Sequence, residues 1–187
     1  ERFALMVVFD TSFILLVLDP RAKAPLDPMT GETVTKPTER VEYLIKNLSA
    51  DREKIIIPTP VLSEVLVYAG EATDKYLDTL NAQSTFRIAP FDQKAAIEAA
   101  IATRDALNRG GLRVDATNPD VTKTKIKFDR QIVAIAKAEG AHSVYSDDDD
   151  VHSYAQRAGL KVFRTADLDL PPENPQMAME LTPPENR

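Results

Sequence analysis

The stretch Leu5-Met6-Val7-Val8-Phe9-Asp10, followed by Thr11-Ser12, indicates the fold class of this chain. Five apolar residues lead directly into a carboxylate, a pattern typical of a strand that is buried on both faces and ends at a polar turn. Such strands belong to parallel α/β sheets, which bind their ligands just outside the carboxyl ends of the strands. We therefore expect Asp10 at the functional edge of a sheet, and Thr11 or Ser12 as the cap of a helix that begins near Phe13.

Apolar runs of strand length alternate with segments of helical periodicity along the rest of the chain. Strands are expected at residues 5–9, 55–57, 86–89, 142–145 and 160–163. Helices are expected at residues 13–18, 38–48, 60–69, 72–82, 93–107, 128–138 and 151–158. This alternation predicts an α/β fold with three layers, α/β/α, built around a mainly parallel sheet of five strands.

Proline content marks the segments that lie outside this pattern. Residues 19–38 contain four prolines and one glycine, so we expect a long loop there. Residues 170–187 contain five prolines and little apolar pattern, which predicts disorder. We expect one folded domain over residues 1–168, followed by a disordered tail over residues 169–187.

The composition limits the classes of protein to which the chain can belong. It contains no cysteine, which excludes disulfides and thiolate metal sites. The longest apolar stretch, residues 5–18, is interrupted by Asp10 and is shorter than the roughly 20 residues that a membrane span needs. The net charge of −6 argues against indiscriminate nucleic-acid binding, although a local basic surface can coexist with metal-binding acids. We expect a soluble, cytoplasmic protein that does not associate with membranes.

Two acids lie on helix faces that also carry apolar residues. Glu64 shares its face of the predicted helix with Val61 and Tyr68, which turns it partly toward the sheet. Asp129 stands three residues before Ile132, so it is expected on the buried face in the first turn of its helix. The helix dipole alone would favour an acid at that end of the helix, but it does not explain the direction in which the acid faces.

Four further acids, Asp147–Asp150, directly follow the fourth predicted strand. An acidic cap and first turn would account for one or two of them. Four carboxylates in succession repel one another and favour a bound cation. Oxygen ligands suit hard cations such as Mg²⁺ or Mn²⁺, which can activate water and neutralise a phosphodiester. The sequence therefore predicts an acidic metal site at one edge of the sheet.

These segments resemble the motifs of the PIN-domain nucleases. The matching segments are Val8-Phe9-Asp10-Thr11-Ser12, Leu62-Ser63-Glu64-Val65, Phe128-Asp129-Arg130-Gln131-Ile132-Val133-Ala134 and Val144-Tyr145-Ser146-Asp147-Asp148-Asp149-Asp150-Val151. The resemblance covers about residues 5–164 and assigns the four acids of the family, in order, to Asp10, Glu64, Asp129 and Asp148. Asp150 matches a frequent fifth acid. Val151 stands where the family pattern has Phe, and the run of four acids leaves Asp147 and Asp149 open as alternatives.

The resemblance implies a metal-dependent endoribonuclease that hydrolyses phosphodiester bonds and leaves a 5′-phosphate. It implies that Asp10, Asp129 and Asp148 hold one or two Mg²⁺ or Mn²⁺ ions, with Asp150 as a further ligand. Glu64 would bind the metal or orient the attacking water. It also implies a VapC-like toxin, with an antitoxin protein and a homodimer as candidate partners. The loop at residues 19–38 and the tail are additions to the compact toxins of this family.

Basic residues and serines near the acids are candidates for substrate binding. Lys125 and Lys127 precede Asp129 at alternate positions, and with Arg130 they are candidates to hold RNA phosphates at the rim of the cleft. An ordinary solvated segment explains these charges equally well. Ser12 and Ser146 flank the proposed acids and are further candidates at the site, although helix capping explains them as well.

Other enzymes also place an acid after the first strand of a parallel sheet. A haloacid-dehalogenase-type phosphatase needs a second aspartate two positions later, where Ser12 stands, and dinucleotide binding needs a glycine-rich turn that is absent here. A phosphoacceptor receiver domain would carry an acidic pair at the start of the chain and a lysine after its last strands. The alternative that remains is a non-catalytic PIN-like module that binds RNA or protein and keeps the acids as relics or folding features.

Overall fold

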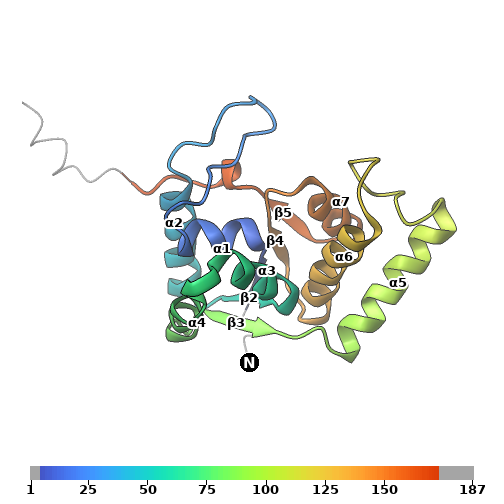
Figure 1. Cartoon of the computed structure of the whole chain (residues 1–187), viewed down its shortest axis with the longest axis horizontal. Helices are drawn as coiled ribbons and strands as arrows, with labels where there is room; N and C mark the ends of the chain where they lie inside the picture. The colour runs from blue at the N-terminus through green and yellow to red at the C-terminus, as the bar shows by residue number, and fades with distance from the viewer. Residues whose placement is uncertain (1–4, 173–187) are drawn as a thin grey trace, which may run out of the picture.

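A sheet of five parallel strands lies at the centre of the computed structural model, which describes residues 5–172 (Figure 1). The strands are β1 (Met6–Phe9), β2 (Lys54–Pro58), β3 (Phe86–Ala89), β4 (Ser143–Tyr145) and β5 (Lys161–Phe163). Their order is β3-β2-β1-β4-β5, and every neighbouring pair is parallel. The structure therefore confirms the α/β class and the parallel five-stranded sheet that the sequence predicts.

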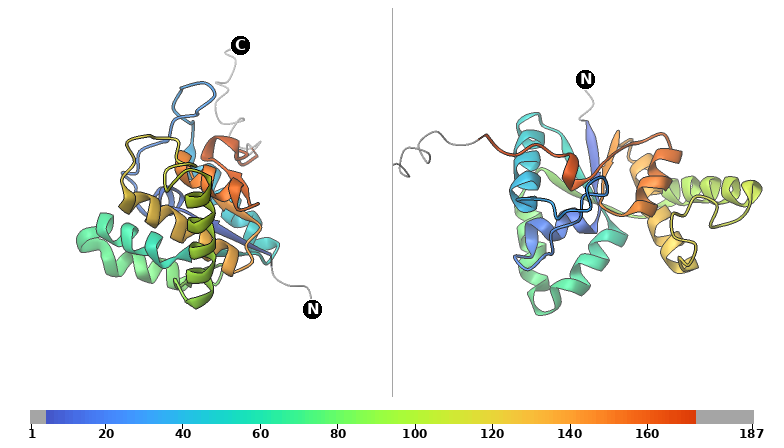
Figure 2. Two further views of the ribbon diagram at one scale, coloured as in Figure 1. Left: turned by 90° about the vertical axis from the view of Figure 1, so that its right-hand side faces the viewer. Right: turned by 90° about the horizontal axis from the view of Figure 1, so that it is seen from above.

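Seven α-helices of the described residues connect the strands. They are α1 (Thr11–Leu18), α2 (Pro37–Ala50), α3 (Thr59–Ala69), α4 (Thr73–Ala82), α5 (Gln93–Arg109), α6 (Lys123–Ala138) and α7 (Asp149–Arg157). Short 3₁₀ turns cover Gly70–Ala72 and Thr165–Asp167. Helices α1 to α4 lie on one side of the sheet and α5 to α7 on the other (Figure 2), as right-handed crossovers require for this strand order.

Strand β1 occupies the middle of the sheet. Val7 pairs with Ile55 of β2 on one side and with Ser143 of β4 on the other. Val7, Val8 and Phe9 are completely buried because helices cover both faces of the strand. This explains why the sequence of β1 is a continuous apolar run and not an alternating one.

Aromatic packing holds the carboxyl ends of the central strands together. The ring centroid of Phe9 lies 5.3 Å from that of Phe13 and 5.4 Å from that of Tyr145. Tyr145 in turn stacks on Phe163 of β5 at 5.1 Å. Hydrogen bonding between the strands continues one residue further, because the backbone N–H of Asp10 donates to the carbonyl of Tyr145 at 3.0 Å. The residues that follow β1 and β4 are thereby held side by side.

Helices α1 and α6, which carry site residues at or near their starts, begin earlier than the sequence predicts. Helix α1 starts at Thr11, and its cap is Asp10, whose carboxylate accepts a hydrogen bond from the backbone N–H of Thr11. Helix α6 starts at Lys123, where Thr122 caps it, so Asp129 lies in the second turn and its predicted first-turn position is wrong. The early start was missed because residues 123–127 carry three lysines and one apolar residue, which gives little periodicity.

Residues 19–36 form the expected long loop, which contains no helix or strand. One antiparallel bridge, between Leu26 and Thr33, closes its outer part. Of the predicted tail, residues 169–172 contain no helix or strand, and residues 173–187 lie outside the described residues. Between residues 5 and 172, none of the helices combines the length and the apolar character that a membrane span requires.

Candidate metal centre

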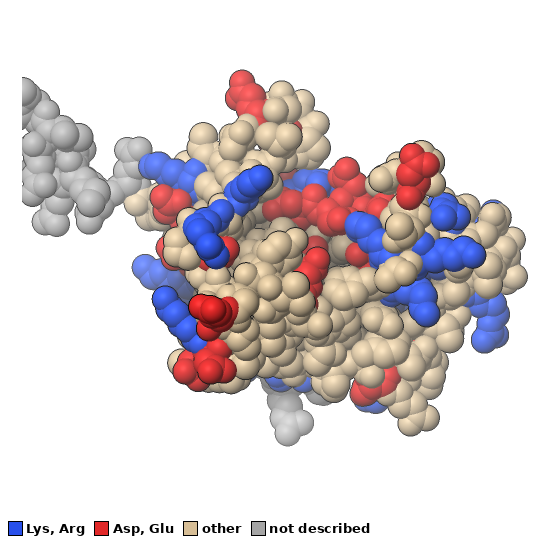
Figure 3. Space-filling model, viewed as in Figure 1, with Lys and Arg blue, Asp and Glu red and all other residues tan. Residues whose placement is uncertain are grey.

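The acids that the sequence singles out come from four places in the fold and converge beyond β1 and β4. Asp10 follows β1, Asp148 and Asp150 follow β4, Glu64 comes from α3 and Asp129 from α6. In the space-filling view, acidic side chains gather in a hollow at the middle of the molecule, with basic side chains on either side (Figure 3). The parallel topology accounts for this convergence, because the carboxyl ends of all five strands share one edge of the sheet.

Three of these acids form a tight triad. Asp129, Asp148 and Asp150 each offer a carboxylate oxygen, and the three oxygens lie within 4.8 Å of one another. The Nζ atom of Lys125 lies among them, at 2.5 Å from Asp129, 3.0 Å from Asp148 and 3.8 Å from Asp150. An ammonium group therefore offsets part of the negative charge of the triad in this structure.

The donor set of the triad fits a divalent cation. Asp129 and Asp150 are buried and Asp148 is half-buried, so their mutual repulsion is poorly screened by solvent. All the ligand atoms are carboxylate oxygens, which Mg²⁺ and Mn²⁺ prefer over nitrogen or sulfur. Lys125 shows that this space attracts and accommodates a positive charge. The triad is thus suited to a hard divalent ion, and its chemistry does not separate Mg²⁺ from Mn²⁺.

The environment of Lys125 keeps its amine charged. Burial works to lower the pKa of Lys125, but the bonds to Asp129 and Asp148 outweigh it and raise the pKa above its usual range. The bond between Lys125 and Asp129 acts to lower the pKa of Asp129. Burial, with the charges of Asp148 and Asp10, raises the pKa of Asp129 to about 7 although Lys125 opposes the shift.

Asp10 lies beside the triad and is only 6% exposed. One carboxylate oxygen accepts from the N–H of Thr11 at 2.7 Å, and the other accepts from the hydroxyl of Ser146 at 2.6 Å. Burial raises the pKa of Asp10 to about 6, and the charges of Asp148 and Glu64 add to the shift, while the two hydrogen bonds oppose it. Asp10, Glu64 and the triad therefore interact as one electrostatic unit.

Glu64 reaches this unit across two helices. Its carboxylate accepts a hydrogen bond from the Thr11 hydroxyl at 2.5 Å, which joins α3 to the start of α1. Glu64, Asp10 and Asp148 line a common cleft of about 590 Å³. Tyr68 lines the same cleft as Glu64, in agreement with their predicted common face, but it is 59% exposed, so this part of the face does not turn toward the sheet as expected.

The structure separates the four consecutive acids after β4 into two pairs. Asp148 caps α7 with one oxygen, which accepts from the N–H groups of Asp150 and Val151, and turns the other toward Lys125. Asp147 instead accepts two hydrogen bonds from Thr165, and Asp149 pairs with Arg164 at 2.5 Å. The triad therefore contains the second and fourth acids of the run.

Two polar residues hold carboxylates of the site in place, and only one of them was a candidate from the sequence. Thr117 donates both its backbone N–H and its hydroxyl to Asp150, each at 2.7 Å. These bonds lower the pKa of Asp150, although its burial acts to raise it. Sequence reasoning missed Thr117 because it lies in an irregular loop. Ser146 was a predicted substrate-binding residue, but its buried hydroxyl donates to Asp10 and accepts from the N–H of Asp148 at 3.1 Å, so it positions carboxylates.

The other predicted substrate-binding residues occupy different surroundings. Ser12 lines the cleft, and its hydroxyl accepts from the N–H of Asp147 at 3.3 Å. Lys127 is exposed on α6, whereas Lys125 points into the triad. Arg130 does not lie at the rim of the cleft, which corrects the prediction. It is buried, donates to the carbonyl of Leu112 at 2.9 Å and covers the ring of Tyr154.

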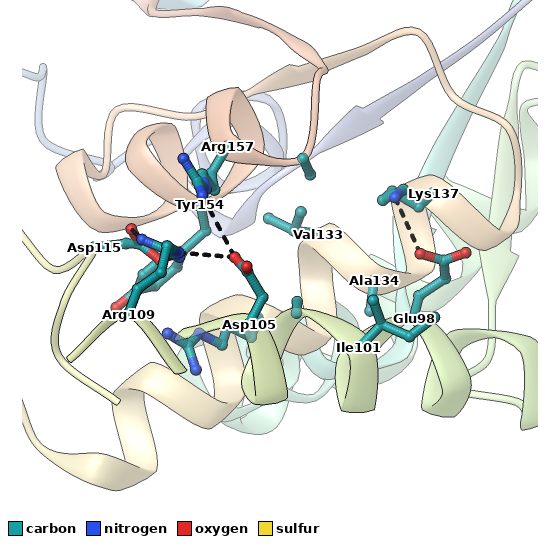
Figure 4. Close-up of a pocket in the computed structure, with 13 residues that line it drawn as sticks. Glu98, Ile101, Asp105, Arg109, Asp115, Val133, Ala134, Lys137, Tyr154 and Arg157 are labelled. Atoms are coloured by element: carbon teal, nitrogen blue, oxygen red, sulfur yellow. Dashed lines mark hydrogen bonds and ion pairs between the residues drawn. The ribbon is translucent and has the colours of Figure 1, made fainter. Parts of the chain in front are cut away.

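Arg130 lines a second, smaller cavity of about 170 Å³ between α5, α6 and α7. Figure 4 shows charged residues at both ends of this cavity, with Val133, Ala134 and Ile101 between them. The charged groups bond one another across the helices, as in the pairs of Arg157 with Asp105 at 3.6 Å and Lys137 with Glu98 at 3.1 Å. We therefore interpret these charges as part of the packing of α5 against α6 and α7.

Solved structures share this fold at low sequence identity. A chain of FitAB bound to an IR36 DNA fragment has a TM-score of 0.57 and 18% identity, over 88% of this chain and 98% of its own. VapBC2 from Rickettsia felis, bound to a DNA fragment from its promoter, has a TM-score of 0.52 and 16% identity, over 88% of this chain and 100% of its own. DNA-bound VapBC from Salmonella typhimurium has a TM-score of 0.52 and 16% identity, over 86% of this chain and 98% of its own. No protein-family model and no curated protein matches the sequence. The structural matches confirm the predicted PIN-like fold.

Asp10→Asn is expected to stabilise the metal-free protein at neutral pH. The pKa of Asp10 is raised from 3.8 to about 6, so the folded state binds this proton more tightly than the unfolded state, and stability falls as pH rises through that window. Asparagine removes the buried charge. Thermal melts in EDTA near pH 7 should show a gain of at least about 1 kcal/mol, or about 2–4 °C. The gain should shrink below the raised pKa and be lost near 3.8.

Asp78→Asn, at an exposed position of α4, is the matched control and should not change the melting temperature at any of these pH values. An Asp10→Asn variant that melts at or below the wild-type temperature near neutral pH would contradict the raised pKa.

Lys125→Met is expected to have opposite effects on stability and on metal affinity. Without the ammonium group the triad repels itself, so the metal-free protein should melt lower by a few degrees, on the order of 1 kcal/mol. A divalent ion would no longer have to displace a bound cation, so calorimetry should show about tenfold tighter Mn²⁺ binding. Lys127→Met, at an exposed position of the same helix, is the control and should change neither quantity. Weaker Mn²⁺ binding by the Lys125 variant would refute this assignment.

Proposed function

We propose that this chain is a divalent-metal-dependent endoribonuclease that hydrolyses RNA phosphodiester bonds in the acidic cleft. The observation that carries the proposal is the triad of Asp129, Asp148 and Asp150, three mostly buried carboxylates that already surround a positive charge next to Asp10 and Glu64. The shared fold with FitAB and VapBC supports it. The choice of RNA as the substrate rests on the resemblance of the sequence motifs to the PIN-domain nucleases.

Asp129, Asp148 and Asp150 would hold Mg²⁺ or Mn²⁺. Asp10 lies close enough to Asp148 for their charges to interact. A bound ion of this kind lowers the pKa of a water molecule and neutralises charge on a phosphodiester. Asp10 is fixed by bonds to both of its oxygens, and Thr117 fixes Asp150. Such bonds orient ligand oxygens before the ligand arrives.

Glu64 is the candidate proton acceptor. The Thr11 hydroxyl holds one of its oxygens, and the half-buried side chain lines the cleft beside Asp10 and Asp148. A carboxylate in this position can take a proton from a water molecule that attacks a phosphate in the cleft.

A second candidate function is a non-catalytic PIN-like module that binds RNA or protein. The position of Lys125 favours it, because a lysine that bridges the triad can hold the acids together without a metal ion. Under this alternative the acids serve the structure alone. The two functions differ in one respect that can be measured, which is whether a divalent ion displaces the ammonium group and enables cleavage.

The resemblance also predicts a VapC-like toxin with an antitoxin partner, and a homodimer. FitAB and VapBC, whose fold this chain shares, were both observed bound to DNA. We propose an antitoxin protein as a partner of this chain, and the homodimer stays a prediction. The long loop of residues 19–36 is an addition to the compact toxins of the family. It weakens the argument for the toxin role more than the argument for the nuclease role.

The decisive test is cleavage of end-labelled RNA by the purified protein with Mn²⁺ or Mg²⁺, compared with EDTA. We expect metal-dependent products that carry 5′-phosphates, and a loss of at least about 100-fold in rate for Asp10→Asn and Asp129→Asn, since removing a pre-oriented charged group commonly has an effect of this size. Asp78→Asn, on the exposed face of α4, should cleave like the wild type.

Millimolar Mn²⁺ should also raise the melting temperature of the wild type, because a ligand at about 100 times its Kd contributes about 2.7 kcal/mol. If no RNA is cleaved and Mn²⁺ leaves the melting temperature unchanged, the non-catalytic alternative is correct.

A further inference from the structure

Two of the basic residues that the sequence offers for RNA binding are engaged elsewhere. The ammonium of Lys125 lies among three carboxylates, and the guanidinium of Arg130 is buried behind the triad against Tyr154. Neither is available at the cleft in this structure. A polyanionic substrate that approaches five acids needs other cations to hold its phosphates near the site.

The cleft that contains Asp10 and Glu64 continues over α1 to the start of the long loop. Its lining there includes Arg21 and Lys23, both of which are exposed. The side chain of Arg21 is 82% exposed and touches Asp19 through Nε at 3.2 Å. Lys23 makes no ion pair within residues 5–172. Asp19 lines the same end. Two cations and one carboxylate leave this end, which we call the basic end, with a net positive charge beside the acidic end.

The backbone holds this basic end in place. Asp19 accepts from the N–H of Arg21 through its carboxylate and from the N–H of Ala22 through its carbonyl, both at 2.9 Å. These bonds form a turn directly after α1. At the other end of α1, its first residue, Thr11, binds both Asp10 and Glu64. The basic residues and the acids are thus attached to opposite ends of one short helix, at a fixed separation.

An aromatic ring also lines this cleft. Tyr68 stands one helical turn after Glu64 on α3, lines the cleft and is 59% exposed. Exposed aromatic rings beside a basic groove are stacking surfaces for nucleic-acid bases, and every base can use them because each has a π-face. In a duplex the faces of the bases are covered by their neighbours, so only an unpaired base can reach such a ring.

We propose that Arg21, Lys23 and Tyr68 form the substrate groove of this protein and select single-stranded RNA. The two basic residues hold phosphates of the strand, and an unpaired base stacks on Tyr68, which brings the neighbouring phosphodiester to Asp10 and Glu64. This proposal rests on the proposed function for its substrate. The arrangement of basic side chains on both sides of the acidic hollow agrees with a strand that crosses the acids (Figure 3).

The test measures binding separately from cleavage. Anisotropy of a short fluorescein-labelled single-stranded RNA is followed with the full chain in EDTA over a series of KCl concentrations. The double variant Arg21→Ala/Lys23→Ala should weaken binding and reduce the slope of log K against log salt by about 1.4, since each phosphate contact to a single strand contributes about 0.7. Tyr68→Ala should weaken binding about tenfold without changing the slope, and Tyr68→Phe should restore it.

The control Lys46→Ala/Lys75→Ala removes the same charge from exposed positions of α2 and α4 and should leave the slope unchanged. Equal losses in this control, equally tight binding of a duplex of the same sequence, or wild-type binding by Tyr68→Ala would each overturn the groove. Melting temperatures of all variants exclude misfolding. If single-stranded RNA binds as expected but is not cleaved with Mn²⁺, the groove stands and the nuclease activity is refuted.

Discussion

The repulsion among carboxylates beyond β1 and β4 is the constraint on which the rest of this site depends. A parallel sheet brings its carboxyl ends together, so acids placed after separate strands must share one small, mostly buried volume. The repulsion is offset by the ammonium group of Lys125 and by hydrogen bonds from the neutral donors of Thr11, Ser146 and Thr117. Two acids nevertheless keep strongly raised pKa values, about 6 for Asp10 and about 7 for Asp129.

The donors that hold the carboxylates also connect the elements of the fold. Thr11 bonds Asp10 through its backbone and Glu64 through its hydroxyl, so this one residue joins the end of β1 to the middle of α3. Ser146 bonds Asp10 and the N–H of Asp148, which joins the ends of β1 and β4. The aromatic rings of Phe9, Phe13 and Tyr145 support these contacts from inside the core. The positions of Asp10 and Asp148 are therefore set by the packed ends of β1 and β4.

Much of this arrangement is readable in the sequence because it follows from local patterns and topology. The continuous apolar run before Asp10 identifies a central parallel strand, and strand ends must meet at one edge. The inward turn of Lys125, the support from Thr117 and the exposure of Tyr68 are set by how α6, the loop before it and α3 pack together. No periodicity encodes those contacts. Arg21 and Lys23 were passed over for the same reason, since a proline-rich loop does not reveal which cavity it borders.

Lys125 and Asp129 lie one turn apart on α6, so the positive charge in the triad is carried by the chain itself. It is present from the moment that this helix forms during synthesis. The folded molecule therefore holds Asp129, Asp148 and Asp150 together without a divalent ion. On the proposed function, such a molecule is folded yet inactive, and the supply of metal sets when it begins to work.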